Sequence, residues 1–155
     1  MKISTALTLL ISVLLTSTMC FGQKRQLVLA GKSMEQMNYV QAIDGRVVGF
    51  TAMKFAFDNY ELSRGMKHHM SCVADAMNQQ GLTVELQGNT DSSGTERYNN
   101  WLGSKRAEAA LNYMVETGAD AGKLSATSQG ESNPRSSNAT QEGMADNRRV
   151  DFIIK

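Results

Sequence analysis

The sequence is poor in several residue types, and each shortage excludes a class of protein. It holds a single proline, Pro134, in 155 residues, and 41% of its residues are hydrophobic against 20% charged. Disordered chains have the opposite balance, because they bury too little apolar surface to fold. The sequence therefore predicts a globular protein with room for one domain of ordinary size.

An excess of one sign of charge is lacking too. The 16 Lys and Arg residues are matched by 15 Asp and Glu residues. Nonspecific binding to nucleic acid needs several basic side chains gathered on phosphates. We therefore expect no nucleic-acid partner.

Long apolar runs are absent after the N-terminus. Lys2 precedes an apolar stretch at residues 3–15 that four Ser and Thr residues interrupt, and this layout is typical of a secretory signal peptide. The stretch is too short to cross a membrane, which takes about 20 apolar residues. We predict that residues 1–22 are an export signal and that the mature chain has no transmembrane span.

Two forms of processing stay open at this signal. Cys20 and Gly22 are small residues that favour cleavage after Gly22, whereas Cys20 could instead carry a lipid, although Ser17 and Met19 suit that reaction poorly. Cys72 is the only other cysteine. Because both routes take Cys20 out of disulfide chemistry, we expect the exported domain to rely on its core rather than on disulfides.

The hydrophobic pattern sharpens at about Val47. Residues 23–46 are weakly patterned, so we predict an N-terminal arm or linker there, with one short strand at 27–30. Residues 47–155 carry regular periodicities. We predict that this second range forms the domain.

A strand, a helix and a second strand open the predicted domain. Alternation at Met53, Phe55 and Phe57 predicts a strand that ends near Asp58. Ser63 is the predicted N-cap of a helix that Gly81 ends. The apolar residues of that helix recur every three or four positions, at Leu62, Met66, Met70, Val73 and Met77. Alternating Leu82, Val84 and Leu86 then predict a half-buried strand over 82–88.

The second half of the domain repeats this order. A polar loop at 89–94 precedes a helix over 95–117, and strands follow at 124–130 and 149–154, with one helical turn near 141–145 between them. The predicted buried face of this second helix comprises Ala107, Ala110, Leu111, Met114 and Val115. The order of elements predicts an α/β fold with a small mixed sheet and helices packed on one face.

Residues in the loops of this domain, and in the helix and strand that adjoin them, form a series in a fixed order. They are Gly88, Asn89, Thr90, Asp91, Tyr98, Asn99, Leu102, Arg106, Ala107, Gly130, Glu131, Pro134, Asn138, Thr140, Glu142, Gly143, Asn147, Arg148, Arg149 and Val150. In this order and spacing the chain resembles the OmpA-like peptidoglycan-binding domain, from about Val47 to Lys155. The resemblance implies a single βαβαββ sandwich.

The resemblance also implies a site for the stem peptide of peptidoglycan, centred on diaminopimelate. The side chain of diaminopimelate ends in an ammonium and a carboxylate on one carbon, so its site needs an anion and a cation held close together on rigid elements. The resemblance assigns Asp91 and Arg106 as the key acidic and basic ligands. The further residues that it implies for the site are Asp58, Phe57, Thr90, Leu102 and Asn99. Of these, Asn99 is expected to hold the loop rather than to touch the ligand.

Three residues depart from the family pattern. Asn89 replaces a histidine and cannot titrate near neutral pH. Gly103 replaces a serine and is expected at a helix N-cap, where it offers no side-chain acceptor. Met144 replaces an arginine. We expect Asn89 and Gly103 to lie near the site and to affect its affinity.

Simpler structural roles stay open for several residues. Asp91 and Arg106 could form a plain surface ion pair that contributes little stability. We expect Arg148 and Arg149 to form salt bridges at the start of the last strand. Asp58 could instead form the turn at the end of its strand. Trp101 is expected to serve packing, with a place beside the ligand groove as the alternative.

Metal binding and catalysis find little support in the sequence. His68, Cys72 and Asp75 have a helical spacing that suits a metal site, but three such residues usually form a polar helix face. An amidase would need a nucleophile beside a base, and Ser92 and Ser93 have no histidine near them in sequence. We predict no cofactor, no metal and no enzymatic activity.

The resulting prediction is a protein exported to the periplasm that links the outer membrane or an envelope assembly to peptidoglycan. A second prediction stays open, in which the chain is a structural component of a larger envelope complex with weak or no wall binding. In that case residues 23–46 would bind the envelope protein partner.

Overall fold

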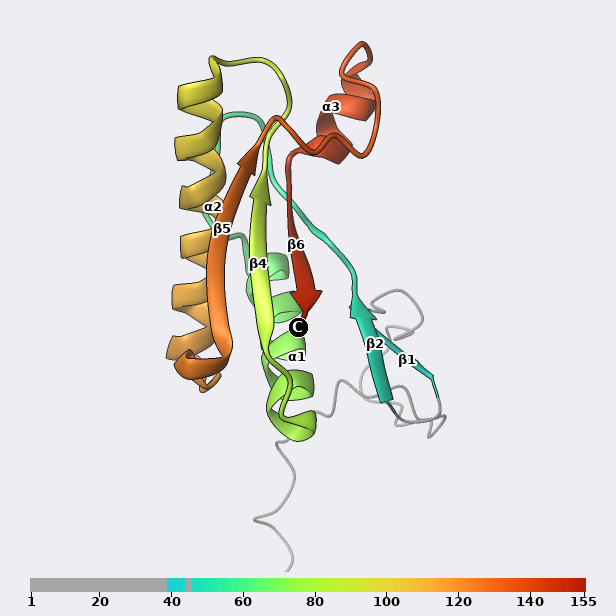
Figure 1. Cartoon of the computed structure of the whole chain (residues 1–155), viewed down its shortest axis with the longest axis vertical. Helices are drawn as coiled ribbons and strands as arrows, with labels where there is room; N and C mark the ends of the chain where they lie inside the picture. The colour runs from blue at the N-terminus through green and yellow to red at the C-terminus, as the bar shows by residue number, and fades with distance from the viewer. Residues whose placement is uncertain (1–38, 44–45) are drawn as a thin grey trace, which may run out of the picture.

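A computed structural model describes residues 39–43 and 46–155. The predicted export signal and the strand predicted at 27–30 lie outside the described residues. Four strands form a mixed sheet in the order β3-β6-β4-β5, where β3 is Met53–Lys54, β4 is Val84–Asn89, β5 is Leu124–Gly130 and β6 is Arg149–Ile154. Strand β4 runs parallel to β5 and antiparallel to β6 (Figure 1).

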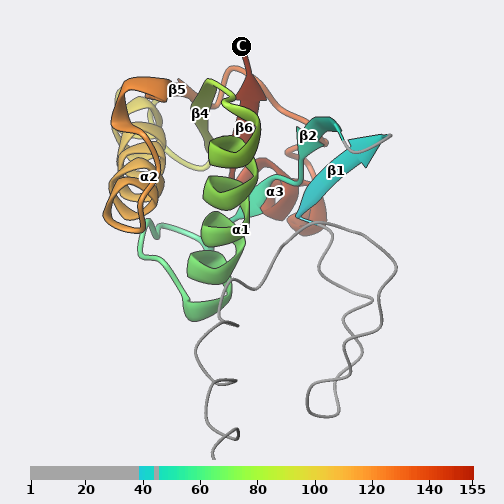
Figure 2. The same ribbon diagram turned by 90° about the horizontal axis from the view of Figure 1, so that it is seen from below.

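Two long helices, α1 (Arg64–Gln80) and α2 (Glu96–Glu116), lie on the same face of this sheet (Figure 2). Ser63 caps α1 by accepting a hydrogen bond from the Met66 N–H, and Thr95 caps α2 by accepting one from the Tyr98 N–H. A 3₁₀ turn, η2 (Ala121–Lys123), and a short helix, α3 (Gln141–Asn147), complete the described elements.

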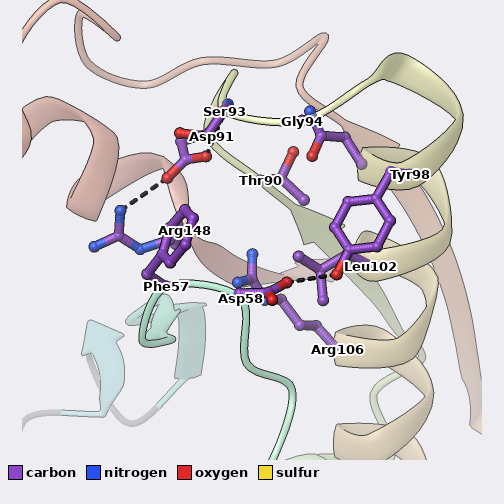
Figure 3. A pocket seen from close by; sticks show the side chains of 11 residues that line it. Phe57, Asp58, Thr90, Asp91, Ser93, Gly94, Tyr98, Leu102, Arg106 and Arg148 are labelled. Carbon is purple, nitrogen blue, oxygen red and sulfur yellow. Dashed lines mark hydrogen bonds and ion pairs between the residues drawn. The ribbon is translucent and has the colours of Figure 1, made fainter.

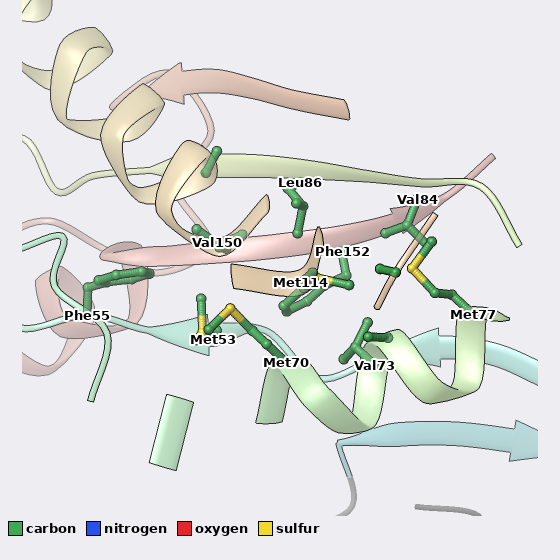
Figure 4. Close-up of a cluster of buried hydrophobic side chains, with 14 residues drawn as sticks. Met53, Phe55, Met70, Val73, Met77, Val84, Leu86, Met114, Val150 and Phe152 are labelled. Carbon is green, nitrogen blue, oxygen red and sulfur yellow. The ribbon is translucent and has the colours of Figure 1, made fainter. Parts of the chain in front are cut away.

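The core fills the space between the sheet and the two long helices (Figure 4). Its strand residues include Val84, Leu86, Val150 and Phe152, which alternate with residues of the opposite face of the sheet. Its helix residues include Met70, Val73, Met77 and Met114, which are all fully buried. The predicted α/β fold, with a small mixed sheet and helices on one face, is therefore confirmed.

The predicted first strand is interrupted in the structure. Its first half pairs as β2 (Arg46–Phe50) with β1 (Val40–Ile43) in a separate antiparallel hairpin. The second half of the predicted strand joins the main sheet only through the two residues of β3. Phe57, at its predicted end, is 65% exposed. The hairpin still packs on the domain, because the Val47 N–H donates to Gln80 Oε1 at 2.9 Å. The hairpin crosses the domain boundary predicted at Val47. That boundary stays a prediction.

Cys72 differs from its prediction. It is disulfide-bonded in the full chain, and its partner lies outside the described residues. The expectation of a domain without disulfides is therefore wrong for the full chain, although cleavage after Gly22 would remove Cys20, the only other cysteine. Within residues 39–43 and 46–155, no three His, Cys, Asp or Glu side chains gather closely enough to hold a metal ion. No helix in these ranges has the length and apolar composition of a membrane span.

Candidate binding site

A small pocket lies at one end of the sheet, where β4 ends and where α2 and β6 begin (Figure 3). Its volume is about 40 Å³, so it can hold the end of a side chain rather than a whole small molecule. All seven residues that the resemblance assigned to the site line it, namely Phe57, Asp58, Thr90, Asp91, Asn99, Leu102 and Arg106. The structure therefore brings together residues from three separate segments of the chain.

Asp91 is held in place from two sides. It directly follows Thr90 at the end of β4, its side chain is 6% exposed, and Oδ2 accepts a hydrogen bond from Arg148 Nη1 at 2.8 Å. Its Oδ1 accepts a second bond from the Ser93 N–H at 3.1 Å. Burial by itself raises the pKa of Asp91, but the bonds from Arg148 and Ser93 together outweigh it and hold the pKa below its usual value. Asp91 is therefore an anion at neutral pH.

Arg106 is fully buried and is bound by three backbone carbonyls. Its Nε donates to Asn59 O at 2.9 Å, Nη1 to Asn89 O at 2.8 Å and Nη2 to Ala56 O at 3.2 Å. Burial lowers the pKa of Arg106 to about 10, with Asp91 acting in the opposite direction. Arg106 thus remains a cation at neutral pH. Because a guanidinium has five N–H donors, two remain for other acceptors.

From the sequence, an ion pair between Asp91 and Arg106 stayed open. In the structure Asp91 pairs with Arg148 instead. The prediction that Arg148 and Arg149 form salt bridges is confirmed, since Arg149 Nε donates to Asp151 Oδ2 at 2.9 Å. Of these two arginines, only Arg148 lines the pocket. Two cations, Arg106 and Arg148, therefore face two anions, Asp91 and Asp58, around one small space.

Thr90 carries the one buried side-chain atom without a hydrogen-bond partner among the described residues that line the pocket. Its backbone N–H donates to Gly130 O at 2.8 Å, which continues the contact between β4 and β5. Its Oγ1 is buried and has no hydrogen-bond partner, although the residue is only 3% exposed. A buried hydroxyl without a partner costs free energy, so Thr90 is suited to accept or donate a hydrogen bond to a bound group.

Asp58 and Tyr98 form the other wall of the pocket (Figure 3). The Tyr98 hydroxyl donates to Asp58 Oδ1, and this bond is the largest cause that raises the pKa of Tyr98. Asp58 has a φ of 50° and is the only non-glycine residue with positive φ in the described chain. Asp is one of the few residues that tolerate this conformation. The turn at Asp58 also directs the neighbouring Phe57 to the surface.

The remaining predicted residues shape the pocket. Asn99 Nδ2 donates to the Glu131 carboxylate and so ties the start of α2 to the loop after β5. This contact agrees with its expected role in holding a loop. Leu102 is 5% exposed and supplies an apolar wall.

The residues that depart from the family pattern lie outside the pocket lining. Asn89 Nδ2 donates to Gln87 O at 2.9 Å and to Asp151 Oδ2 at 3.2 Å, so the side chain is directed toward β6. Gly103 lies inside α2 and not at its N-cap, which is Thr95. The expectation for Gly103 was therefore wrong, because the N-cap lies eight residues earlier. Met144 Sδ accepts a bond from the Ser93 hydroxyl at 3.7 Å, at the edge of the pocket.

Sequence reasoning missed several pocket residues. Ser93, Gly94 and Tyr98 lie in the loop and helix that follow Asp91. Their position in the sequence between Asp91 and Asn99, two predicted site residues, could have indicated that they line the pocket. Trp101 was expected to serve packing, but it is 44% exposed. It lies against Tyr98, with 5.4 Å between the ring centroids.

Known proteins resemble the chain in both sequence and fold. The profile of the OmpA family matches residues 54–148. The peptidoglycan-associated lipoprotein of Pseudomonas putida is 32% identical over 117 residues, which cover 72% of this chain and 70% of that protein. The outer membrane porin F of Pseudomonas aeruginosa is 40% identical over 105 residues, or 66% of this chain and 30% of the porin.

A solved structure gives the same result for the fold. The crystal structure of the peptidoglycan-associated lipoprotein from Burkholderia pseudomallei superposes with a TM-score of 0.64 at 30% identity, covering 67% of this chain and 89% of that one. The chain spans less than half the length of the curated porin F and outer membrane protein A relatives that it matches. These relatives place it at the cell envelope, in the periplasm and associated with the outer membrane and cell wall, as the sequence predicted. The chain belongs to the OmpA family.

Proposed function

We propose that this chain is a noncatalytic module that binds peptidoglycan and thereby connects the outer membrane or an envelope assembly to the cell wall. We further propose that the pocket receives the end of a diaminopimelate side chain. The names of the peptidoglycan-associated relatives support the first part. The pocket geometry supports the second.

The observation that carries the proposal is the pairing of opposite charges with an unsatisfied hydroxyl in so small a space. The spare N–H groups of Arg106 suit a carboxylate, and Asp91 suits an ammonium. The Thr90 hydroxyl lacks a partner in the described structure. A zwitterion on one carbon would supply both charges and a partner for Thr90 at once.

Cosedimentation of the purified protein with insoluble peptidoglycan tests the wall-binding part. We expect the protein to pellet with the wall and Asp91→Asn to lower the pelleted fraction strongly. Asp146→Asn is the matched control, because Asp146 pairs with Lys54 at the surface and does not line the pocket. Failure of the well-folded protein to pellet would favour the second prediction, a structural component that contacts protein partners.

Calorimetry with two stem tripeptides tests the diaminopimelate part. One tripeptide ends in diaminopimelate, and the other carries lysine, which keeps the ammonium but lacks the second carboxylate. Hydrogen bonds to charged groups contribute about 1.5–3 kcal/mol, so we expect the lysine tripeptide to bind about tenfold to a hundredfold more weakly. Equal affinities would refute diaminopimelate recognition and leave wall binding intact.

A partner protein for residues 23–46 is a separate part of the proposal. Only residues 39–43 of that range and Arg46 are described, and they contribute β1 and the first residue of β2. A pull-down from envelope extract with and without residues 23–38 tests whether this segment holds a partner.

A further inference from the structure

Three aromatic side chains form an exposed surface beside the pocket, here called the aromatic patch and comprising Tyr60, Tyr98 and Trp101. They are 42%, 41% and 44% exposed, respectively. The ring centroids of Tyr60 and Trp101 are 6.0 Å apart, and those of Tyr98 and Trp101 are 5.4 Å apart. Large aromatic side chains are seldom left in contact with water as a group, and such groups usually mark a binding surface.

The aromatic patch is held rigidly and continues the pocket. Tyr98 and Trp101 lie three residues apart in the first turns of α2 and therefore share one helix face. Tyr98 also lines the pocket, where its hydroxyl is bonded to Asp58. A ligand whose end lies in the pocket thus meets the Tyr98 ring at the pocket wall and the Trp101 ring directly beyond it.

We propose that the aromatic patch binds a sugar ring of the peptidoglycan glycan strand, with Trp101 contacting the C–H face of the ring. This inference rests on the proposed function. In peptidoglycan, diaminopimelate is the third residue of a peptide attached to a sugar, so two residues separate it from the glycan. Two extended residues span at most about 7 Å, and the aromatic patch directly adjoins the pocket, because Tyr98 belongs to both. The sugar therefore falls within reach of the aromatic patch.

The surroundings of the aromatic patch favour a sugar over an apolar protein surface. Polar groups adjoin the rings where the aromatic patch meets the pocket, since the Tyr98 hydroxyl donates to the Asp58 carboxylate. A sugar offers an apolar C–H face together with hydroxyl and acetamido groups, and this surface offers rings next to donors and acceptors. A wholly apolar partner would leave those polar groups without partners.

Two ligands that share one peptide separate this inference from the proposed function. The first is the disaccharide-tripeptide released from peptidoglycan by a muramidase, and the second is the same tripeptide freed of sugar by an amidase. An aromatic contact contributes about 0.5–1.5 kcal/mol, so we expect the disaccharide-tripeptide to bind about threefold to tenfold more tightly. Trp101→Ala should remove this difference and leave the affinity for the sugar-free tripeptide unchanged, whereas Trp101→Phe should retain most of it.

Trp101 is the only tryptophan in the chain, so its fluorescence reports on the aromatic patch directly. We expect the disaccharide-tripeptide to shift the emission and to protect it from acrylamide quenching, and the tripeptide to do so far less. Ile153→Ala is the control, because Ile153 is 37% exposed and projects from the opposite face of the sheet. Equal affinities of the two ligands for the wild-type protein would overturn the sugar contact alone. A wild-type protein that binds neither ligand would overturn the proposed function as well.

Discussion

Arg106 contributes to folding as well as to the pocket. Its guanidinium donates to the carbonyls of Ala56, Asn59 and Asn89, which belong to segments on either side of α1. We expect Arg106→Ala to lower the free energy of unfolding by about 3 kcal/mol or more, because three buried carbonyls lose their donor. Urea denaturation measures this loss, and a variant as stable as the wild type would contradict it. Arg106→Ala is therefore a poor choice for testing binding alone.

Thr90 allows binding to be tested without disturbing the fold. Its Oγ1 has no partner, so Thr90→Val should leave the melting temperature unchanged or raise it. The same change should weaken binding of the diaminopimelate tripeptide by about twofold to tenfold, the usual value of one hydrogen bond. Calorimetry measures this affinity, and Thr90→Ser, which keeps the hydroxyl, is the matched control. Binding by Thr90→Val at wild-type affinity would show that the ligand does not use the hydroxyl.

The pocket residues could be found from the sequence only in part. Thr90 and Asp91 could be placed at a strand end from local pattern, and the resemblance supplied their role. The ion pair between Asp91 and Arg148 could not be found, because 57 residues separate the two and only the pairing of β4 with β6 brings them together. The contact between Trp101 and Tyr60 could not be found either, because Tyr60 belongs to another segment of the chain.

At the scale of elements, β4 and α2 meet backbone to backbone at Gly88 and Gly103. A Cβ atom at Gly88 would lie 1.9 Å from Gly103 O. We expect Gly88→Ala to lower the free energy of unfolding by at least about 1–3 kcal/mol, because strand and helix would have to separate. Gly65→Ala in the first turn of α1 is the control, since a Cβ there meets only Ser63 Oγ at 4.0 Å and should raise stability by up to about 1 kcal/mol. Equal losses in the two variants, measured by urea denaturation, would refute the close contact.

Helix α1 is linked to the N-terminal hairpin region by a buried histidine. His69 stacks on Tyr39 with 4.0 Å between ring centroids, and burial lowers the pKa of His69 to about 4 while a hydrogen bond with the Thr51 backbone opposes this shift. In the unfolded chain His69 takes up a proton near pH 6.5, whereas in the folded chain it does so only near pH 4. The contribution of His69 to the free energy of unfolding is therefore fully present above pH 6.5 and is lost as the pH falls from 6.5 toward 4. The shift corresponds to about 3 kcal/mol at most.

Urea denaturation at pH 7 and pH 4 tests this linkage. His69→Phe can keep the stacking on Tyr39 but does not titrate, so we expect it to lose less stability at pH 4 than the wild type loses. Ser71→Ala on the same helix provides the control, because Ser71 does not titrate and its hydroxyl is bonded to Lys67 O, so this variant should keep the wild-type pH dependence. A wild type and a His69→Phe variant with the same pH dependence would contradict the prediction.

The helices were predictable because their signals are local. Ser63, the apolar face of α1 and Gly81 lie within 19 consecutive residues, and the structure places the cap residues as predicted. The hairpin was missed because β1 has no such pattern and is defined by its pairing with β2. The order of strands in the sheet likewise depends on contacts between distant residues, such as Leu86 with Phe152.

At the scale of the whole molecule, the charged pocket and the hairpin lie at different parts of the fold. The pocket is at the end of the sheet where β4 ends, whereas β1 and β2 lie toward the other end, beside α1 (Figure 1). We therefore expect substitutions in the pocket to leave the hairpin and its contacts with α1 undisturbed.

The N-terminal limit of the folded unit gives a prediction at this scale. The boundary predicted at Val47 would cut the hairpin, removing the Tyr39 ring from His69 and the bond from the Thr51 N–H to Tyr39 O, which is 2.9 Å long. We expect a chain that begins at residue 47 to be less stable than one that begins at residue 39 by about 2 kcal/mol, the combined value of an aromatic contact and a hydrogen bond. Neither chain contains Cys20, so the disulfide does not enter the comparison. Urea denaturation of the two chains measures the difference, and equal stabilities would place the limit of the folded unit at Val47.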